Sequence, residues 1–133
     1  MNNQEILYRY RHPSYAGDVD VFLEKESTPG EKVLWVEDEN PFCGDSLRLA
    51  LRITEEGKIK EAIYDGYGCS LCIASTEWLL ESVTGRLVRE ALRTREEVLH
   101  GLGDVQVSKN RRNCVDLSLR MMKSLQEQWE GDV

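Results

Sequence analysis

The feature that most constrains the fold is a strict alternation of apolar with polar or small residues over residues 47–53. The apolar positions are Leu47, Leu49, Leu51 and Ile53, and the residues between them are Arg48, Ala50 and Arg52. Because successive side chains of a strand point to opposite faces, this period of two predicts a strand with one face in a core. A turn-forming run at residues 55–58 and a second apolar run at residues 59–64 complete a predicted β-hairpin.

Shorter signals predict the remaining elements. A β-branched and aromatic run at residues 33–36 predicts a strand before the hairpin, which makes the sheet an antiparallel meander. Apolar residues at helical spacing predict helices over residues 4–10, 69–83, 87–92 and 115–129. Thr94 and Glu97 have the spacing of a capping box and predict the start of one more short helix.

This order of elements predicts the fold class. Strands followed by helices are typical of an α+β fold, here a small three-stranded antiparallel sheet with helices packed on one face. Residues 17–30 are expected to form a mixed connection before the sheet. A length of 133 residues suits a single domain spanning residues 1–133. A chain of this length can bury a core without needing metals or disulfides to stay folded.

The charge balance and the absence of long apolar runs exclude several function classes. The chain has 17 basic and 24 acidic residues, and the resulting net charge of −7 repels a phosphate backbone. No apolar run approaches the ~20 residues that a membrane span needs, and the polar start of the chain does not resemble a secretory signal. We therefore expect a cytoplasmic protein without nucleic-acid or membrane partners. Its four cysteines then stay mostly reduced, which favours metal binding or reactive chemistry over disulfides.

Three of the cysteines fall at junctions between predicted elements. Cys43 lies in the loop between the first two strands, Cys69 lies between the third strand and the long helix, and Cys114 opens the last helix. Such junctions are places where side chains from distant parts of a chain can converge. Glycines at positions 44, 66 and 68 allow the tight turns that such a cluster needs.

Asp45 adds a carboxylate two residues after Cys43. Three thiolates and one carboxylate form a complete tetrahedral set for Zn²⁺ or Fe²⁺. A carboxylate is the harder ligand, so this set should hold a thiophilic metal less firmly than four thiolates. Cys69 and Cys114 are both expected at helix N-termini, where thiol pKa values are lowered, and Arg111 and Arg112 should help Cys114 to ionise. The alternative is that each cysteine is a small buried packing residue.

The fourth cysteine, Cys72, stands one helical turn after Cys69. It could supply an extra ligand, relay a persulfide or form a reversible disulfide with Cys69. It could also serve only for packing, because cysteine is a small apolar residue that proteins often bury.

At these residues the sequence resembles the U-type iron–sulfur cluster assembly scaffold family, which comprises IscU, the N-terminal domain of NifU, and SufU. The resemblance covers nearly the whole chain and rests on a few short motifs. They are His-Pro-Ser-Tyr-Ala-Gly at residues 12–17, Asn-Pro-Phe-Cys-Gly-Asp at residues 40–45, Gly-Tyr-Gly-Cys-Ser at residues 66–70, Ile-Ala-Ser at residues 73–75, and Cys114.

The resemblance implies a SufE/NifU-like sandwich and a scaffold that is not an enzyme. Such a scaffold accepts sulfur as a persulfide from a cysteine desulfurase, binds Fe²⁺, builds a transient [2Fe-2S] cluster and passes it to acceptor proteins. The implied ligands are Cys43, Asp45, Cys69 and Cys114, with Zn²⁺ often present in the same site. Cys114 and Cys43 are the candidate sulfur acceptors, and a monomer or weak oligomer is expected. The alternative is a zinc-containing sulfurtransferase that stimulates a desulfurase without building a cluster.

Three departures from the family pattern bear on this choice. IscU proteins carry a histidine just before the third cysteine, where this chain has Asn113. Their Pro-Pro-Val-Lys chaperone-recognition stretch is absent, because residues 107–111 are Val-Ser-Lys-Asn-Arg. SufU proteins carry a longer insertion before the last cysteine than this chain has. The sequence therefore lies between the branches of the family.

Overall fold

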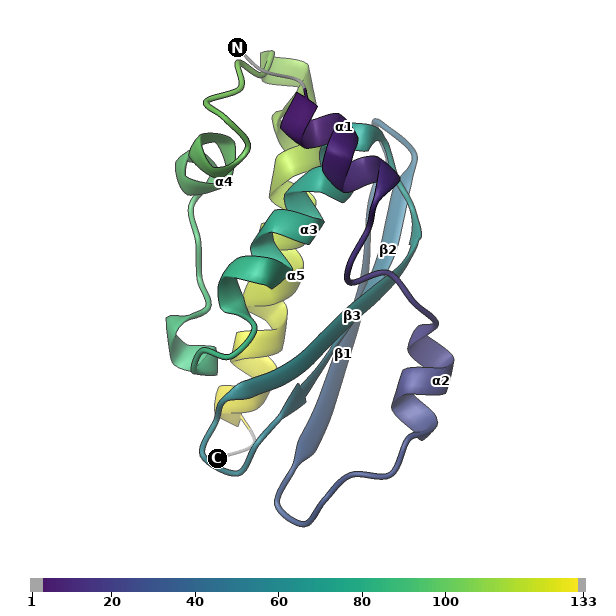
Figure 1. Ribbon diagram of the computed structural model, residues 1–133, viewed down its shortest axis with the longest axis vertical. Helices are drawn as coiled ribbons and strands as arrows, with labels where there is room; N and C mark the ends of the chain where they lie inside the picture. The colour runs from purple at the N-terminus through teal and green to yellow at the C-terminus, as the bar shows by residue number, and fades with distance from the viewer. Residues whose placement is uncertain (1–3, 132–133) are drawn as a thin grey trace.

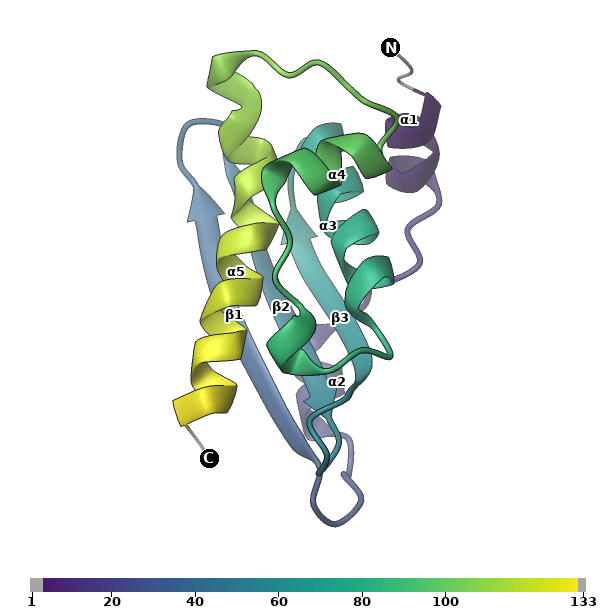
Figure 2. The ribbon, with the colours of Figure 1, turned by 90° about the vertical axis from the view of Figure 1, so that its left-hand side faces the viewer.

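The polypeptide forms a three-stranded sheet with two long helices laid across one of its faces, as Figure 1 and Figure 2 show. The computed structural model describes residues 4–131, so both ends of the predicted domain lie outside the described residues. The strands are β1 (Lys32–Asn40), β2 (Asp45–Ile53) and β3 (Ile59–Tyr67). The helices are α1 (Gln4–Arg11), α2 (Val19–Glu24), α3 (Ser70–Val83), η1 (Val88–Glu90), α4 (Arg95–Gly101), η2 (Lys109–Arg111) and α5 (Arg112–Gly131).

The sheet is the predicted antiparallel meander, with β2 between β1 and β3. The alternating apolar side chains of β2 lie on the face that α3 and α5 cover, and each is at most 1% exposed; they are Leu47, Leu49, Leu51 and Ile53. All three strands extend beyond the predicted apolar runs. The polar residues at the end of β1 pair with the start of β2, because a strand at the sheet edge can expose charged side chains. The α+β fold class is confirmed.

A short helix that the sequence analysis did not predict covers the opposite face of the sheet. Helix α2 begins after Asp18, whose carboxylate accepts a hydrogen bond from the N–H of Val21 at 3.2 Å, an ordinary N-cap. Val19 and Phe22 pack against Ala50 on this face and form a second, smaller core. Residues 17–30 therefore contain a helix as well as a connection.

The helical half of the chain agrees with the predictions except at residues 87–92, where the predicted helix is the three-residue 3₁₀ turn η1. The capping box of Thr94 and Glu97 is present in both directions at the start of α4. Helix α5 begins at Arg112, directly after the 3₁₀ turn η2. Within residues 4–131, none of the helices combines the length and the apolar character that crossing a bilayer requires.

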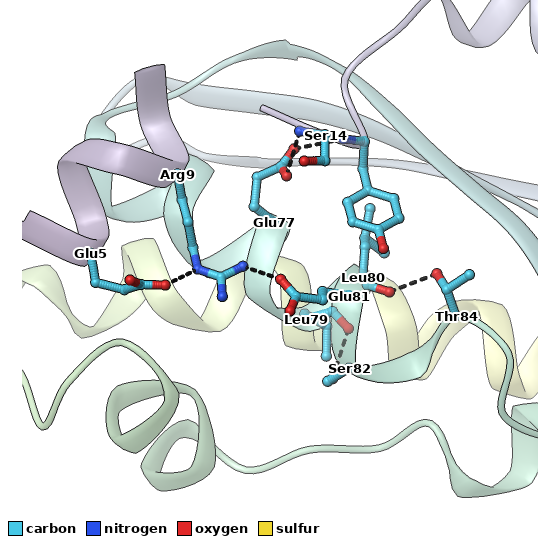
Figure 3. Close-up of polar contacts among 10 residues, drawn as sticks. Glu5, Arg9, Ser14, Glu77, Leu79, Leu80, Glu81, Ser82 and Thr84 are labelled. Carbon is cyan, nitrogen blue, oxygen red and sulfur yellow. Dashed lines mark hydrogen bonds and ion pairs between the residues drawn. The ribbon is translucent and has the colours of Figure 1, made fainter. Parts of the chain in front are cut away.

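The N-terminal segment is attached to α3 by polar contacts that run from a buried to an exposed position, drawn in Figure 3. The carboxylate of Glu77 is 2% exposed and accepts the backbone N–H groups of Ser14 and Tyr15 at 2.8 and 3.0 Å. One turn further, Arg9 bridges Glu5 and Glu81, with both contacts at 2.6 Å. We call this group of contacts the N-terminal clasp.

Candidate metal and sulfur site

The first part of the site is the loop between β1 and β2. Asn40 and Asp45 face each other in register, so residues 41–44 form a tight turn. The N–H groups of Cys43 and Gly44 donate to the Asn40 carbonyl at 3.2 and 2.9 Å. Gly44 has a φ of 72°, which glycine adopts without strain. The turn leaves Cys43 exposed at its tip and holds Asp45 buried at its base, at 1% exposure.

The second part is the junction of β3 and α3. Cys69 is the N-cap of α3, and its thiol accepts a hydrogen bond from the N–H of Cys72 at 3.4 Å. The N–H of Cys69 donates to Asp45 Oδ1 at 2.9 Å, which links this junction to the hairpin loop. Gly68 lies in a tight space, because a Cβ there would lie 3.0 Å from Cys72 Sγ and 3.3 Å from Asp45 Oδ1. Cys69 is half-buried at this junction.

The third part is the first turn of α5. Cys114 is the third residue of this helix and is 1% exposed. Its sulfur lies 3.2 Å from the sulfur of Cys43, and the side-chain nitrogen of Asn40 lies 4.0 Å from it. Side chains from three separated stretches of the chain therefore meet at one end of the sheet.

Three of these groups lie close enough together to bind one metal ion. One ligand atom from each of Cys43, Asp45 and Cys114 lies within 4.8 Å of the other two. Thiolates bound to one Zn²⁺ at about 2.3 Å lie roughly 3.8 Å apart, so small side-chain movements bring these atoms into range. Cys69 lies outside this group of three, with its thiol turned toward the first turn of α3. The donor set of thiols and carboxylate fits Zn²⁺ or Fe²⁺.

The electrostatics of Cys114 differ from the prediction. Burial, reinforced by the neighbouring thiols of Cys43 and Cys69, raises the pKa of Cys114 instead of lowering it. The guanidinium of Arg111 turns to Cys69, with Nη2 3.7 Å from its sulfur. The expectation that the helix terminus, Arg111 and Arg112 would lower the pKa of Cys114 was therefore wrong. A bound cation reverses this preference, because a coordinating thiol loses its proton.

Two site features were not identified from the sequence. Asn40 is 2% exposed, and its amide lies 3.5 Å from Asp45 Oδ2 as well as beside Cys114, so it positions two candidate ligands at once. The signal that could have found it is its position at the start of the Asn-Pro-Phe-Cys-Gly-Asp motif. The other feature is an open cleft beside Cys43, lined by Phe42, Arg111, Arg112 and Asn113.

Cys72 lies in the first turn of α3 and is fully buried. Burial is the main reason why its pKa is raised, and the charges of Asp45, Cys69 and Cys114 add to the effect. Its thiol therefore faces the same cluster of groups as the predicted ligands and lies on their interior side.

A comparison with protein families finds a match over nearly the whole chain. Residues 1–131 match the family described as NifU-like N terminal domain. The scaffold protein IscU of Haemophilus influenzae is 29% identical over 89 residues, which cover 67% of this chain and 65% of that protein. IscU of Buchnera aphidicola subsp. Acyrthosiphon pisum is 39% identical over 89 residues, with the same coverage of 67% and 65%. The matched segment thus spans slightly less than two thirds of these relatives.

Solved structures show the same fold at lower identity. A NifU-like N-terminal protein from Brucella abortus superposes with a TM-score of 0.73 at 16% identity, over 98% of this chain and 95% of that one. A SUF-system scaffold candidate, SufU of Fervidobacterium islandicum, superposes with a TM-score of 0.70 at 20% identity, over 94% and 96% of the two chains. At these identities the likeness establishes the fold.

Proposed function

Because the chain belongs to the NifU-like N-terminal domain family, we propose that it is a scaffold on which a labile [2Fe-2S] cluster is built. In this proposal the chain acts as one cytoplasmic domain and is not an enzyme. The observation that carries it is the meeting of Cys43, Asp45 and Cys114, from separate elements, within 4.8 Å of one another. The relatives named IscU are described as iron–sulfur cluster assembly scaffold proteins, which supports the same function.

The proposed ligands are Cys43, Asp45, Cys69 and Cys114. Cys69 joins the other three when its thiol turns away from the first turn of α3, where it now accepts a single hydrogen bond of 3.4 Å. Asp45 is the hard ligand in an otherwise thiolate set, so its bond to iron is the weakest of the four. A site of this composition suits a cargo that must leave, and it also accommodates Zn²⁺ in the absence of a cluster.

The proposed partners are a cysteine desulfurase that donates persulfide sulfur and acceptor proteins that take the cluster. Cys43 is the more accessible of the two sulfur acceptor candidates, because it is exposed at a loop tip whereas Cys114 is 1% exposed. The two sulfurs lie 3.2 Å apart, so sulfur placed on Cys43 can pass to Cys114 by thiol exchange. The open cleft beside Cys43 leaves room for a donor loop.

The experiment that tests this function is anaerobic reconstitution. Metal-free protein is incubated with a cysteine desulfurase, cysteine, Fe²⁺ and a reductant, and the visible spectrum is recorded together with iron and sulfide content. We expect a cluster that Cys43→Ser abolishes and that survives about tenfold longer in Asp45→Ala, because the hard ligand is removed. Asp38→Ala, on the same hairpin but ion-paired with Arg120, is the matched control.

The alternative is a zinc-containing sulfurtransferase, and the same experiment recognises it. Asn113 stands beside Cys114 and lines the cleft at Cys43, where an IscU-type histidine would offer a further ligand. Protein that keeps one Zn²⁺, accelerates the desulfurase and forms no cluster would replace the scaffold proposal with this one.

A further inference from the structure

The thiols of Cys69 and Cys72 lie three residues apart at the start of α3. Cys69 is the N-cap of α3, and Cys72 is the third residue of that helix. Residues three apart on a helix are neighbours on one face, close enough for a disulfide after a small adjustment. The hydrogen bond of 3.4 Å from Cys72 N–H to Cys69 Sγ shows that the Cys69 side chain is already folded toward Cys72.

The two thiols differ in access, as the two members of an exchange pair must. Cys69 is half-buried, with Arg111 3.7 Å from its sulfur, so it can receive sulfur from outside or from a neighbouring thiol. Cys72 is fully buried behind Gly68, whose missing Cβ leaves the space that the Cys72 sulfur occupies. Cys72 is therefore shielded from solvent, and its sulfur lies at the Gly68 contact beside Asp45.

We propose that Cys72 is a resolving cysteine, which reduces a persulfide carried on Cys69 to sulfide. The sulfur of Cys72 bonds to the inner sulfur of the Cys69 persulfide, and the S–S bond to the outer sulfur breaks. The outer sulfur takes the electron pair and leaves with the thiol proton of Cys72 and its own proton as H₂S. The two thiols are oxidised to a Cys69–Cys72 disulfide, while the sulfane sulfur is reduced by two electrons.

Asp45 lies beside this pair of cysteines. Its carboxylate borders the same Gly68 space as the Cys72 sulfur and accepts the N–H of Cys69 at 2.9 Å. A second dithiol, such as a cellular thiol reductant, must then reduce the disulfide before Cys69 can bind metal.

This inference rests on the proposed function, because the reaction of Cys72 supplies the sulfide that a cluster scaffold needs. Two of the electrons for cluster formation then come from the thiols of the chain itself. A Cys72 that served only for packing would leave a persulfide on Cys69 unchanged, which separates the two roles experimentally.

The test uses a variant in which Cys69 and Cys72 are the two remaining cysteines. In Cys43→Ser/Cys114→Ser, the competing thiols 3.2 Å apart are absent. Reduced, metal-free protein is treated anaerobically with glutathione persulfide and desalted, and sulfide, protein mass and disulfide position are then measured without added reductant. We expect about one sulfide per chain and a disulfide between Cys69 and Cys72.

Adding Cys72→Ala or Cys72→Ser to this variant should leave the persulfide on Cys69 and slow sulfide release at least about tenfold. Two substitutions are used because the position is buried, and urea unfolding verifies that each variant is folded. Ser75→Ala, at another fully buried position of α3, is the matched control and should release sulfide at the parental rate. Equal sulfide release without Cys72, or a disulfide that joins other residues, would overturn the proposal.

Failure of this inference is distinguishable from failure of the scaffold function. Wild-type protein supplied with Fe²⁺ and ready-made sulfide needs no persulfide reduction. If it builds a cluster although Cys72 releases no sulfide, only the resolving role is lost. If it builds none although the pair releases sulfide, the scaffold function is lost and the dithiol chemistry remains.

Discussion

The two halves of helix α3 use polar side chains in opposite ways. At its N-terminal end, the thiol of the N-cap Cys69 makes long contacts, 3.4 Å from the N–H of Cys72 and 3.7 Å from Nη2 of Arg111. In its second half, the carboxylates of Glu77 and Glu81 make contacts of 2.6 to 3.0 Å in the N-terminal clasp. Sulfur is a weak hydrogen-bonding atom, whereas a carboxylate bonded to N–H groups is strongly held.

This difference separates the residues that stabilise the fold from the residues that can bind a metal ion. The buried carboxylate in the clasp is satisfied by the chain itself, so it contributes to folding and has nothing left to offer a ligand. The thiols of the site make weak contacts, so a metal ion can replace those contacts at little cost. Changes in the clasp should therefore alter stability, and changes at the thiol site should alter binding.

The largest effect is expected from removal of the buried clasp carboxylate. Glu77→Ala leaves the N–H groups of Ser14 and Tyr15 without their acceptor and should lower the free energy of unfolding by about 3 kcal/mol. Urea unfolding followed by circular dichroism measures this. Zn²⁺ affinity of the folded protein should stay at the wild-type value. A large loss of affinity with little loss of stability would show that the two regions are not separate.

Zn²⁺ binding at the thiol site should also raise the free energy of unfolding. Zn²⁺ at a free concentration 100 times its Kd should raise the free energy of unfolding by about 2.7 kcal/mol, and a chelator should remove this gain. Thermal unfolding with and without Zn²⁺ measures the effect. Cys114→Ser should remove the response, because this residue lies in the group of Cys43, Asp45 and Cys114. An equal stabilisation of Cys114→Ser would place the metal elsewhere.

Replacement of Asn40 tests whether metal binding depends on a side chain that orients the ligands. Asn40→Ala removes the amide that lies 3.5 Å from Asp45 and 4.0 Å from Cys114. Zn²⁺ affinity should fall about 10- to 100-fold, or roughly 1.4 to 2.8 kcal/mol, as is usual for groups that orient metal ligands. A competition titration with a chromophoric chelator gives the affinity. Asn110→Ala, an exposed residue of the nearby cleft, is the control, and an effect equal to that of Asn40→Ala would contradict a positioning role.

The sequence predicts those features that depend on local spacing. The alternation at residues 47–53 depends only on the two faces of a strand, and the capping box at Thr94 depends on four consecutive residues. Both are present in the structure. The positions of Cys43, Cys69 and Cys114 at junctions follow in the same way, since strand and helix ends are local features.

Features that depend on tertiary packing could not be predicted. The pKa of Cys114 is raised because α5 buries it against the hairpin loop, and no nearby residue reveals that burial. Asn40 contacts Cys114 across 74 positions of the chain, so its role emerges only when β1 and α5 meet. Helix α2 is shorter than the window over which helical periodicity can be recognised. Its N-cap Asp18 was the one local signal for the start of a helix.

The smallest effect is expected at the exposed end of the clasp. Glu81 is 60% exposed in its ion pair with Arg9, so Glu81→Ala should cost less than about 1 kcal/mol, and added salt should reduce that cost. Urea unfolding at low and high ionic strength measures it. A double-mutant cycle with Arg9→Met isolates the pair from the second contact, between Arg9 and Glu5. A cost near that of Glu77→Ala would mean that the clasp depends on its surface charges instead of on the buried carboxylate, which would remove the physical basis for contrasting it with the thiol site.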